Sequence, residues 1–153
     1  MKYVTNSYDI TEQFDRIDID TLAGDVEFRP SQDGICRVEC YEREKLQHDV
    51  SVSNGTLMIL VDDTRSWLDH ISIINFNTPK ITVYLPRGEY AALTLKGSTC
   101  DVEIPDVFSF ESLDIAVSTG DVTCSASVTG SMKIKASTGD IKVGDLMAGE
   151  LAL

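Results

Sequence analysis

The sequence predicts an all-β fold: a right-handed β-solenoid, similar to a single-stranded β-helix, with coils of about 19–20 residues. Three observations predict it. A twelve-residue unit returns at a nearly constant interval, each unit alternates apolar and polar residues, and no segment has the apolar stripe of a long helix. One short coil cannot bury its apolar face alone, so stacked coils must enclose it in a tube. Parallel coils of this kind are expected to wind right-handed.

The first clear element is residues 17–28, which matches the later units, with Gly24 in the place of Gly120. The interval from Ile17 to Leu93 equals roughly four coil lengths, which permits a continuous solenoid through the middle. This N-terminal part, about residues 1–90, is nevertheless less regular than the repeats that follow. The whole chain, 1–153, is expected to form a single β-strand-repeat domain.

The irregular part holds a predicted hairpin. Asn54-Gly55 lies between two apolar runs, which is the strongest short signal for a two-residue β-turn. Residues 42–47 contain helix-forming side chains but no apolar stripe, so a charged strand or a solvated loop is favoured over a helix. Further strands are expected at 36–40, 57–61 and 81–85.

The regular repeats occupy residues 93–153. Three full units cover 93–104, 113–124 and 132–143, and Leu151 opens a fourth that this chain does not finish. In each unit two alternating strands flank a Ser-Thr-Gly-Asp-like corner, which predicts an interior and an exterior row. The interior is expected to include Val117, Val122, Cys124, Ile141 and Val143, and the exterior Asp114, Lys133 and Lys135.

The unfinished fourth unit suggests a truncated array. The last full coil would then have only a partial neighbour, with apolar side chains near an open end. Weak self-association through this C-terminal edge is the expected consequence.

The charge balance limits the partners. The chain has 13 Lys and Arg against 25 Asp and Glu, a formal net charge of −12. Such a surface repels nucleic acids and anionic lipids, so no nucleic-acid partner is expected. No run of 18 apolar residues and no charged-then-apolar leader is visible, so this chain is expected to make no membrane contact of its own.

Corner residues of the repeats form the candidate sites. The glycines are expected to adopt a positive φ at sharp corners, and Cys100 replaces the expected glycine in one coil. The aspartates that follow would stack into a column about 4.8 Å apart, which is a candidate cation-binding or ligand-binding row. A structural role is favoured, in which each aspartate accepts hydrogen bonds from its own turn. The predicted turn glycines are Gly24, Gly120 and Gly139, and the aspartates are Asp25, Asp101, Asp121 and Asp140.

Other chemistry is weakly indicated. Asp62, Asp63, Asp69 and His70 match no known coordination loop, so no metal site is predicted there, and Trp67 is favoured as a plug over apolar surface. No catalytic residue and no cofactor is predicted, because neither a nucleophile elbow nor a phosphate loop is present.

The four cysteines are predicted to be free thiols. Cys36 and Cys40 share a strand face but lie roughly 13 Å apart, beyond the limit of about 7 Å for a disulfide. Cys124 aligns with core positions of the other units, and Cys100 sits at a corner.

Ser-Thr-Gly-Asp at Ser118 and Ser137, Ala-Gly-Asp-Val at Ala23 and Ile-Thr-Val-Tyr-Leu-Pro at Ile81 resemble the bacterial putative-adhesin family of β-strand-repeat domains of unknown function. The resemblance implies a β-helix-like fold displayed at the cell envelope or extracellular face of a bacterium. The favoured function is a non-enzymatic surface module that presents a solenoid face to a protein or glycan. The alternatives are a scaffold that polymerises end to end and, third, a polysaccharide-active enzyme.

Overall fold

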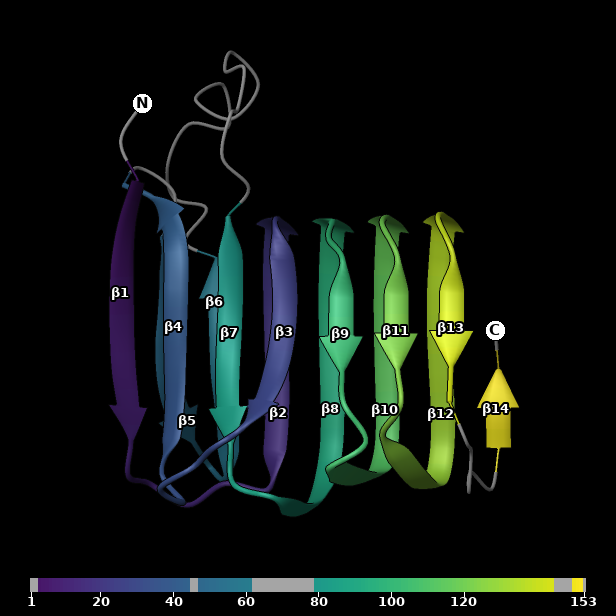
Figure 1. The fold of residues 1–153 in the computed structure, drawn as a ribbon, viewed down its shortest axis with the longest axis horizontal. Coiled ribbons are helices and arrows are strands. Elements are labelled where there is room, and N and C mark those ends of the chain that lie inside the picture. The colour runs from purple at the N-terminus through teal and green to yellow at the C-terminus, as the bar shows by residue number, and fades with distance from the viewer. Residues whose placement is uncertain (1–2, 45–46, 62–78, 145–149, 153) are drawn as a thin grey trace.

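A computed structural model describes residues 3–44, 47–61, 79–144 and 150–152, and within these ranges every regular element is a strand. The strands form two seven-stranded sheets that face each other (Figure 1). The predicted all-β class is therefore confirmed. The first sheet contains, in spatial order, β1 (Tyr3–Ile10), β4 (Cys36–Arg43), β7 (Lys80–Leu85), β3 (Asp25–Pro30), β9 (Val102–Ile104), β11 (Val122–Cys124) and β13 (Ile141–Val143). The second contains β14 (Glu150–Ala152), β12 (Ser127–Thr138), β10 (Phe108–Thr119), β8 (Gly88–Thr99), β2 (Arg16–Ala23), β6 (Thr56–Val61) and β5 (His48–Ser53).

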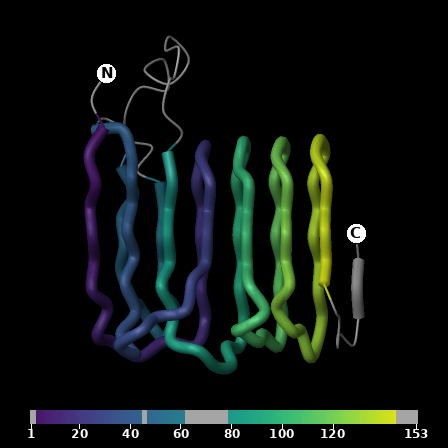
Figure 2. Tube along the Cα trace, in the orientation of Figure 1, coloured from purple at the N-terminus to yellow at the C-terminus, as the bar shows by residue number. Residues whose placement is uncertain are grey.

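The C-terminal part consists of stacked coils (Figure 2). Each coil gives a long strand to the second sheet and a short strand to the first, and equivalent strands pair in parallel. Leu113 pairs with Leu93 on one side and with Met132 on the other, so equivalent residues of successive units share one register position. The recurring unit of the sequence is thus one layer of the molecule.

The core lies between the two sheets. Val117, Val122 and Cys124 are buried as predicted, and Ile141 and Val143 are half-buried in the last strand of the first sheet. The three side chains that were predicted to face outward, Asp114, Lys133 and Lys135, are exposed. Period-two alternation therefore assigns the interior face of each coil correctly.

The middle of the chain does not continue the array, so the interpretation of the interval between Ile17 and Leu93 as continuous coils is wrong. Ile17 pairs directly with Leu93, which makes β2 and β3 the neighbours of β8 and β9. The intervening strands lie on the other side of β2 and β3. There β6 pairs in parallel with β2, and β7 with β3. The outer strands pair antiparallel with their neighbours: β5 with β6, β4 with β7, and the N-terminal β1 with β4. A length that is a multiple of the period says nothing about which strands become neighbours.

The predicted hairpin is confirmed. Strands β5 and β6 pair antiparallel up to Ser53 and Thr56. Asn54 and Gly55 connect them with φ angles of 52° and 76°. Two successive positive φ values characterise the turn whose twist matches that of paired strands. Residues 42–44, at the start of the charged segment, continue β4 into a turn, so no helix begins there.

The corner of each coil explains why glycine recurs. Gly24, Gly120 and Gly139 have φ angles of 116°, 140° and 134°. A Cβ atom on Gly120 would collide with the carbonyl oxygen of Cys100 in the neighbouring coil, and one on Gly139 with that of Gly120. Backbone packs on backbone here, so no side chain fits.

Cys100 occupies the corner without a positive φ, and its side chain is buried in the core. A Cβ atom on Gly97 would collide with the Cys100 Sγ atom, so the missing side chain of Gly97 leaves the space that the thiol fills. The partners of Gly97 in the neighbouring coils are Val117 and Thr21. In this coil the two residue types have exchanged places: a glycine, Gly97, lies on the strand, and a residue with a side chain, Cys100, lies at the corner.

This exchange predicts a strong coupling between two substitutions. Gly97→Val should cost about 2–3 kcal/mol because the valine overlaps the thiol, and Cys100→Gly about 2 kcal/mol because it leaves a cavity. The double variant recreates the pattern of the next coil and should lie within about 1 kcal/mol of the wild type. Urea denaturation of the wild type, the two single variants and the double variant measures the four free energies of unfolding. If the two single costs simply added in the double variant, the exchange would be contradicted.

Candidate functional site

The predicted aspartate row lies where the chain passes from the second sheet to the first. The backbone N–H of Asp121 donates to Asp101 Oδ1 at 2.8 Å, and that of Asp140 donates to Asp121 Oδ1 at 2.9 Å. The N–H of Asp101 donates to Asp25 in the same way. Sequence reasoning expected the donors in each aspartate's own turn, but they lie one coil away. The carboxylates of Asp25, Asp101 and Asp121 thus continue the hydrogen bonding between coils across a corner that interrupts the main-chain ladder.

Asp25, Asp101 and Asp121 also line a groove of about 290 Å³, together with residues that include Glu27 and Lys80. Partial burial, followed by the charge of Asp101, raises the pKa of Asp25 above its ordinary value. The pKa of Glu27 is lowered, chiefly by the hydrogen bond from Arg29 and further by Lys80. The N-terminal end of the row is therefore balanced by cations.

The raised pKa of Asp25 predicts a pH-dependent gain for Asp25→Asn. A carboxyl whose pKa is higher in the folded state destabilises that state as pH rises through the folded pKa, so removing its charge should help at neutral pH. The asparagine Oδ1 atom still accepts the Asp101 N–H. We expect a gain of no more than about 0.5 kcal/mol at pH 7, because solvent screens the site. The gain should vanish below the ordinary pKa of 3.8.

Urea denaturation at both pH values tests this expectation. Asp114→Asn is the matched control, because Asp114 is an exposed aspartate of β10 whose register partner is Lys133. A gain in the control, or a gain at Asp25 that persists at acidic pH, would contradict the assignment.

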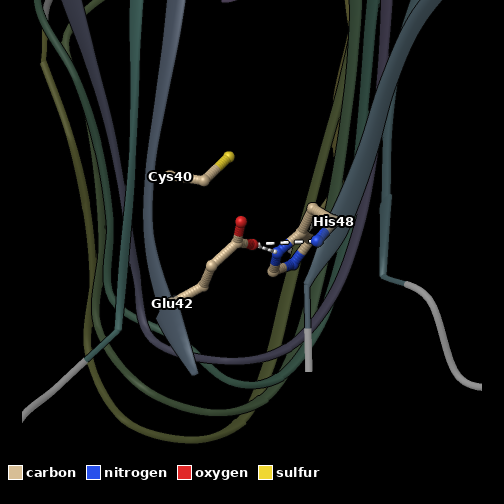
Figure 3. Close-up of side chains that lie close together, drawn as sticks. All are labelled: Cys40, Glu42 and His48. Atoms are coloured by element: carbon tan, nitrogen blue, oxygen red, sulfur yellow. Dashed lines mark hydrogen bonds and ion pairs between the residues drawn. The ribbon is translucent and has the colours of Figure 1, made fainter. Parts of the chain in front are cut away.

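A second group of polar side chains lies between the two sheets, at the end of the molecule formed by β1, β4 and β5 (Figure 3). Glu42 continues the inward row of β4 that contains Cys36 and Cys40, and Thr21 continues the inward row of β2. His48 is the first residue of β5, which belongs to the same sheet as β2, and it faces Glu42 from across the core. Sequence analysis missed this cluster, although one signal was visible: Glu42 is in phase with an apolar alternation.

The cluster is tightly hydrogen-bonded. Glu42 Oε1 lies 2.8 Å from His48 Nδ1 and accepts the His48 backbone N–H at 2.8 Å. Glu42 Oε2 accepts the Asn6 amide at 2.7 Å, and His48 Nε2 lies 2.7 Å from Thr21 Oγ1. The exposed fractions of Glu42, His48 and Thr21 are only 1%, 6% and 3%. A hydroxyl, an imidazole and a carboxylate in line can pass protons among themselves, and both carboxylate oxygens are bonded.

A cavity of about 90 Å³ adjoins this cluster. Thr21, Glu42 and His48 of the cluster line it. The remaining lining residues are Leu22, Ala23, Arg43, Val61 and Pro79. The segment that follows Val61, with Asp62, Asp63, Trp67, Asp69 and His70, lies outside the described residues.

All four cysteines are free, as predicted, and all four are buried. Burial raises the pKa of Cys36, Cys40 and Cys100 to about 12 and also raises that of Cys124. Thiols of this kind stay protonated and react slowly at neutral pH.

The sequence profile described as Toastrack DUF4097 matches residues 14–153. The chain belongs to the Toastrack DUF4097 family. The resemblance drawn from the Ser-Thr-Gly-Asp corners, to a bacterial family of β-strand-repeat domains of unknown function, is thereby confirmed. The profile includes both the aspartate row and the buried cluster apart from Asn6. No curated protein matches the chain.

Three solved structures resemble the Toastrack chain. One is described as a putative cell adhesion protein from Clostridium sporogenes, with 8% identity, 99% of each chain covered and a TM-score of 0.58. A putative adhesin from Bacteroides fragilis has 16% identity, coverage of 99% and 97%, and a TM-score of 0.41. One from Parabacteroides distasonis has 17% identity, coverage of 98% and 74%, and a TM-score of 0.45. Because its sequence identity is so low, the Clostridium sporogenes structure supports the fold alone.

The Toastrack chain contains no helix, within the ranges that the structure describes, that is long and apolar enough to cross a bilayer.

Proposed function

We propose that this Toastrack chain is a non-enzymatic binding module of the bacterial cell envelope, and that the outer face of its first sheet binds a glycan. The observation that carries the proposal is an open groove of about 540 Å³ over β3, β4 and β7. The segment 31–35 between β3 and β4 forms one wall. The proposal includes a single domain over residues 1–153, with right-handed coils of about 19–20 residues.

The groove combines the side chains that carbohydrates require. Tyr84 offers a half-buried aromatic ring, and Ile35, at 44% exposure, is the one large hydrophobic side chain exposed among the described residues. Both can cover the apolar face of a sugar ring. Donors and acceptors for hydroxyl groups surround them: Arg29, Ser31, Gln32, Asp33, Arg37 and Glu39.

Ion pairs hold the two guanidinium groups in place. Arg29 Nε lies 2.7 Å from Glu27 Oε1, and Arg37 Nε lies 2.7 Å from Asp9 Oδ1. A planar donor that is already oriented loses less side-chain entropy on binding. The groove therefore supports recognition of hydroxyl or carboxylate groups on a sugar, although the chain carries a net charge of −12.

A glycan array, followed by calorimetry on any glycan that binds, tests the proposal. Tyr84→Ala should lower the affinity at least about tenfold, because a stacked aromatic ring contributes on the order of 1.5 kcal/mol. Tyr41→Ala is the matched control, since Tyr41 is also half-buried on the outer face of the first sheet but stacks on Tyr3 outside the groove. Equal losses in both variants, or binding that neither affects, would contradict the groove.

Two further outcomes would replace the proposal. Capture of a defined envelope protein in the absence of glycan binding would favour a protein partner. Release of reducing sugar from a bound polysaccharide would favour an enzyme, the third function considered.

The second candidate function is self-assembly, which the end of the first sheet favours. Ile141 and Val143 of β13 are half-buried, whereas their register partners Val122 and Cys124 are fully buried. A second copy could cover this edge. Analytical ultracentrifugation over a range of concentrations should then show association that Ile141→Lys reduces, and a monomer at all concentrations would exclude this candidate.

A further inference from the structure

We propose that Cys40, Glu42 and His48 form a binding site for a single divalent transition-metal ion of the zinc class. The site lies between the two sheets, at the end of the molecule formed by β1, β4 and β5 (Figure 3). It is separate from the groove on the outer face of the first sheet.

The three side chains converge on one point. One ligand atom from each, a sulfur, a carboxylate oxygen and a ring nitrogen, lies within 4.8 Å of the other two. In a tetrahedral zinc site such atoms lie about 3.3–3.6 Å apart, so shifts on the order of 1 Å complete the geometry. Thiolate, imidazole and carboxylate together are a donor set that suits zinc better than calcium or magnesium.

The charges also match. A thiolate and a carboxylate supply two negative charges and the imidazole is neutral, so a divalent ion makes the assembly electrically neutral. Neutrality is important because the three residues are at most 6% exposed, and an uncompensated charge there is costly. Binding would release the Cys40 thiol proton to solvent, and the proton between His48 Nδ1 and Glu42 Oε1, which are 2.8 Å apart, would move to Nε2 and leave its place to the ion.

Neighbouring groups already orient the ligands. Thr21 Oγ1 lies 2.7 Å from His48 Nε2, so an Nε2–H donated to this hydroxyl leaves the Nδ1 lone pair for the metal. The Asn6 amide holds Glu42 Oε2 at 2.7 Å. Metal ligands in proteins generally have partners of this kind, which set the tautomer and the direction of each side chain.

The three ligands lie on strands of the two sheets. Cys40 and Glu42 are two residues apart on the inward face of β4, and His48 enters from the facing sheet. The cavity of about 90 Å³ beside Glu42 and His48 is large enough for a water molecule as the fourth ligand. Three protein ligands and one open position is a common arrangement for zinc.

Titration of the chelator-treated wild-type protein with Co²⁺ under reducing conditions tests the proposal. We expect one equivalent to bind, with a thiolate-to-cobalt charge-transfer band in the near ultraviolet, and one equivalent of Zn²⁺ to displace it. Zn²⁺ at 100 times its Kd should raise Tm by roughly 5–10 °C. A polar cluster without metal affinity would show no band and no shift, and that result would overturn the proposal.

Two variants on the same strand locate the site. Cys40→Ala should abolish the charge-transfer band, whereas Cys36→Ala should keep it, because Cys36 is equally inward and buried on β4 but lies outside the cluster. A band that survives in Cys40→Ala would overturn the assignment. If Cys40→Ala does not fold, X-ray absorption of the wild-type zinc complex decides, since it must show one sulfur at about 2.3 Å beside nitrogen and oxygen ligands.

Discussion

Gly120→Ala is expected to lower the free energy of unfolding by about 3–5 kcal/mol, which is a large part of the stability of a typical domain. Gly120 has a φ angle of 140°, a conformation that side chains rarely adopt, and strain alone costs about 1–3 kcal/mol. The new methyl group would also meet the Cys100 carbonyl, which belongs to the backbone of the neighbouring coil. That carbonyl cannot move without disturbing the stacking of two coils.

Gly34→Ala separates the two contributions. Gly34 also has a positive φ, 76°, but nothing lies within 4 Å of the position that its Cβ atom would take. We expect a cost of about 1 kcal/mol from backbone strain alone. Chemical denaturation of both variants measures the difference, and equal costs would show that the coils can separate enough to admit a side chain.

Glu42→Ala should lower the free energy of unfolding by about 3–5 kcal/mol in metal-free buffer, because it removes the acceptor of three donors. The backbone N–H of His48 and its ring nitrogen would lose their partner, and the Asn6 amide would keep only its longer bond to Gln47 Oε1 at 3.2 Å. The first two are buried, so water can replace the carboxylate only through the adjoining cavity.

Glu39→Ala is the matched control, since Glu39 lies on the same strand but on its outer face. Its cost should stay within about 0.5 kcal/mol. Urea denaturation, monitored by far-ultraviolet circular dichroism, provides both values. Similar costs for the two glutamates would mean that the buried network contributes little to stability.

The candidate sites were predicted to different degrees. The aspartate row was visible in the sequence because Asp101, Asp121 and Asp140 recur at the period of the coils and Asp25 lies in the same Gly-Asp-Val pattern as Asp121. The donors that each carboxylate meets were not visible, since they belong to the next coil along the chain. The groove on the outer face of the first sheet and the buried cluster of Cys40, Glu42 and His48 were not predicted. Each combines residues of strands that become neighbours only through the order of strands in the sheets.

The sequence by itself determined the local features of this Toastrack chain. Alternation of apolar and polar residues assigned the two faces of each coil, Asn54-Gly55 determined a hairpin, and the repeated glycines marked the corners, because each depends on residues close together in the chain. Tertiary structure alone decided that Ile17 pairs with Leu93. Pairing between distant strands depends on which edges the rest of the chain leaves open, and spacing along the sequence carries no information about that choice.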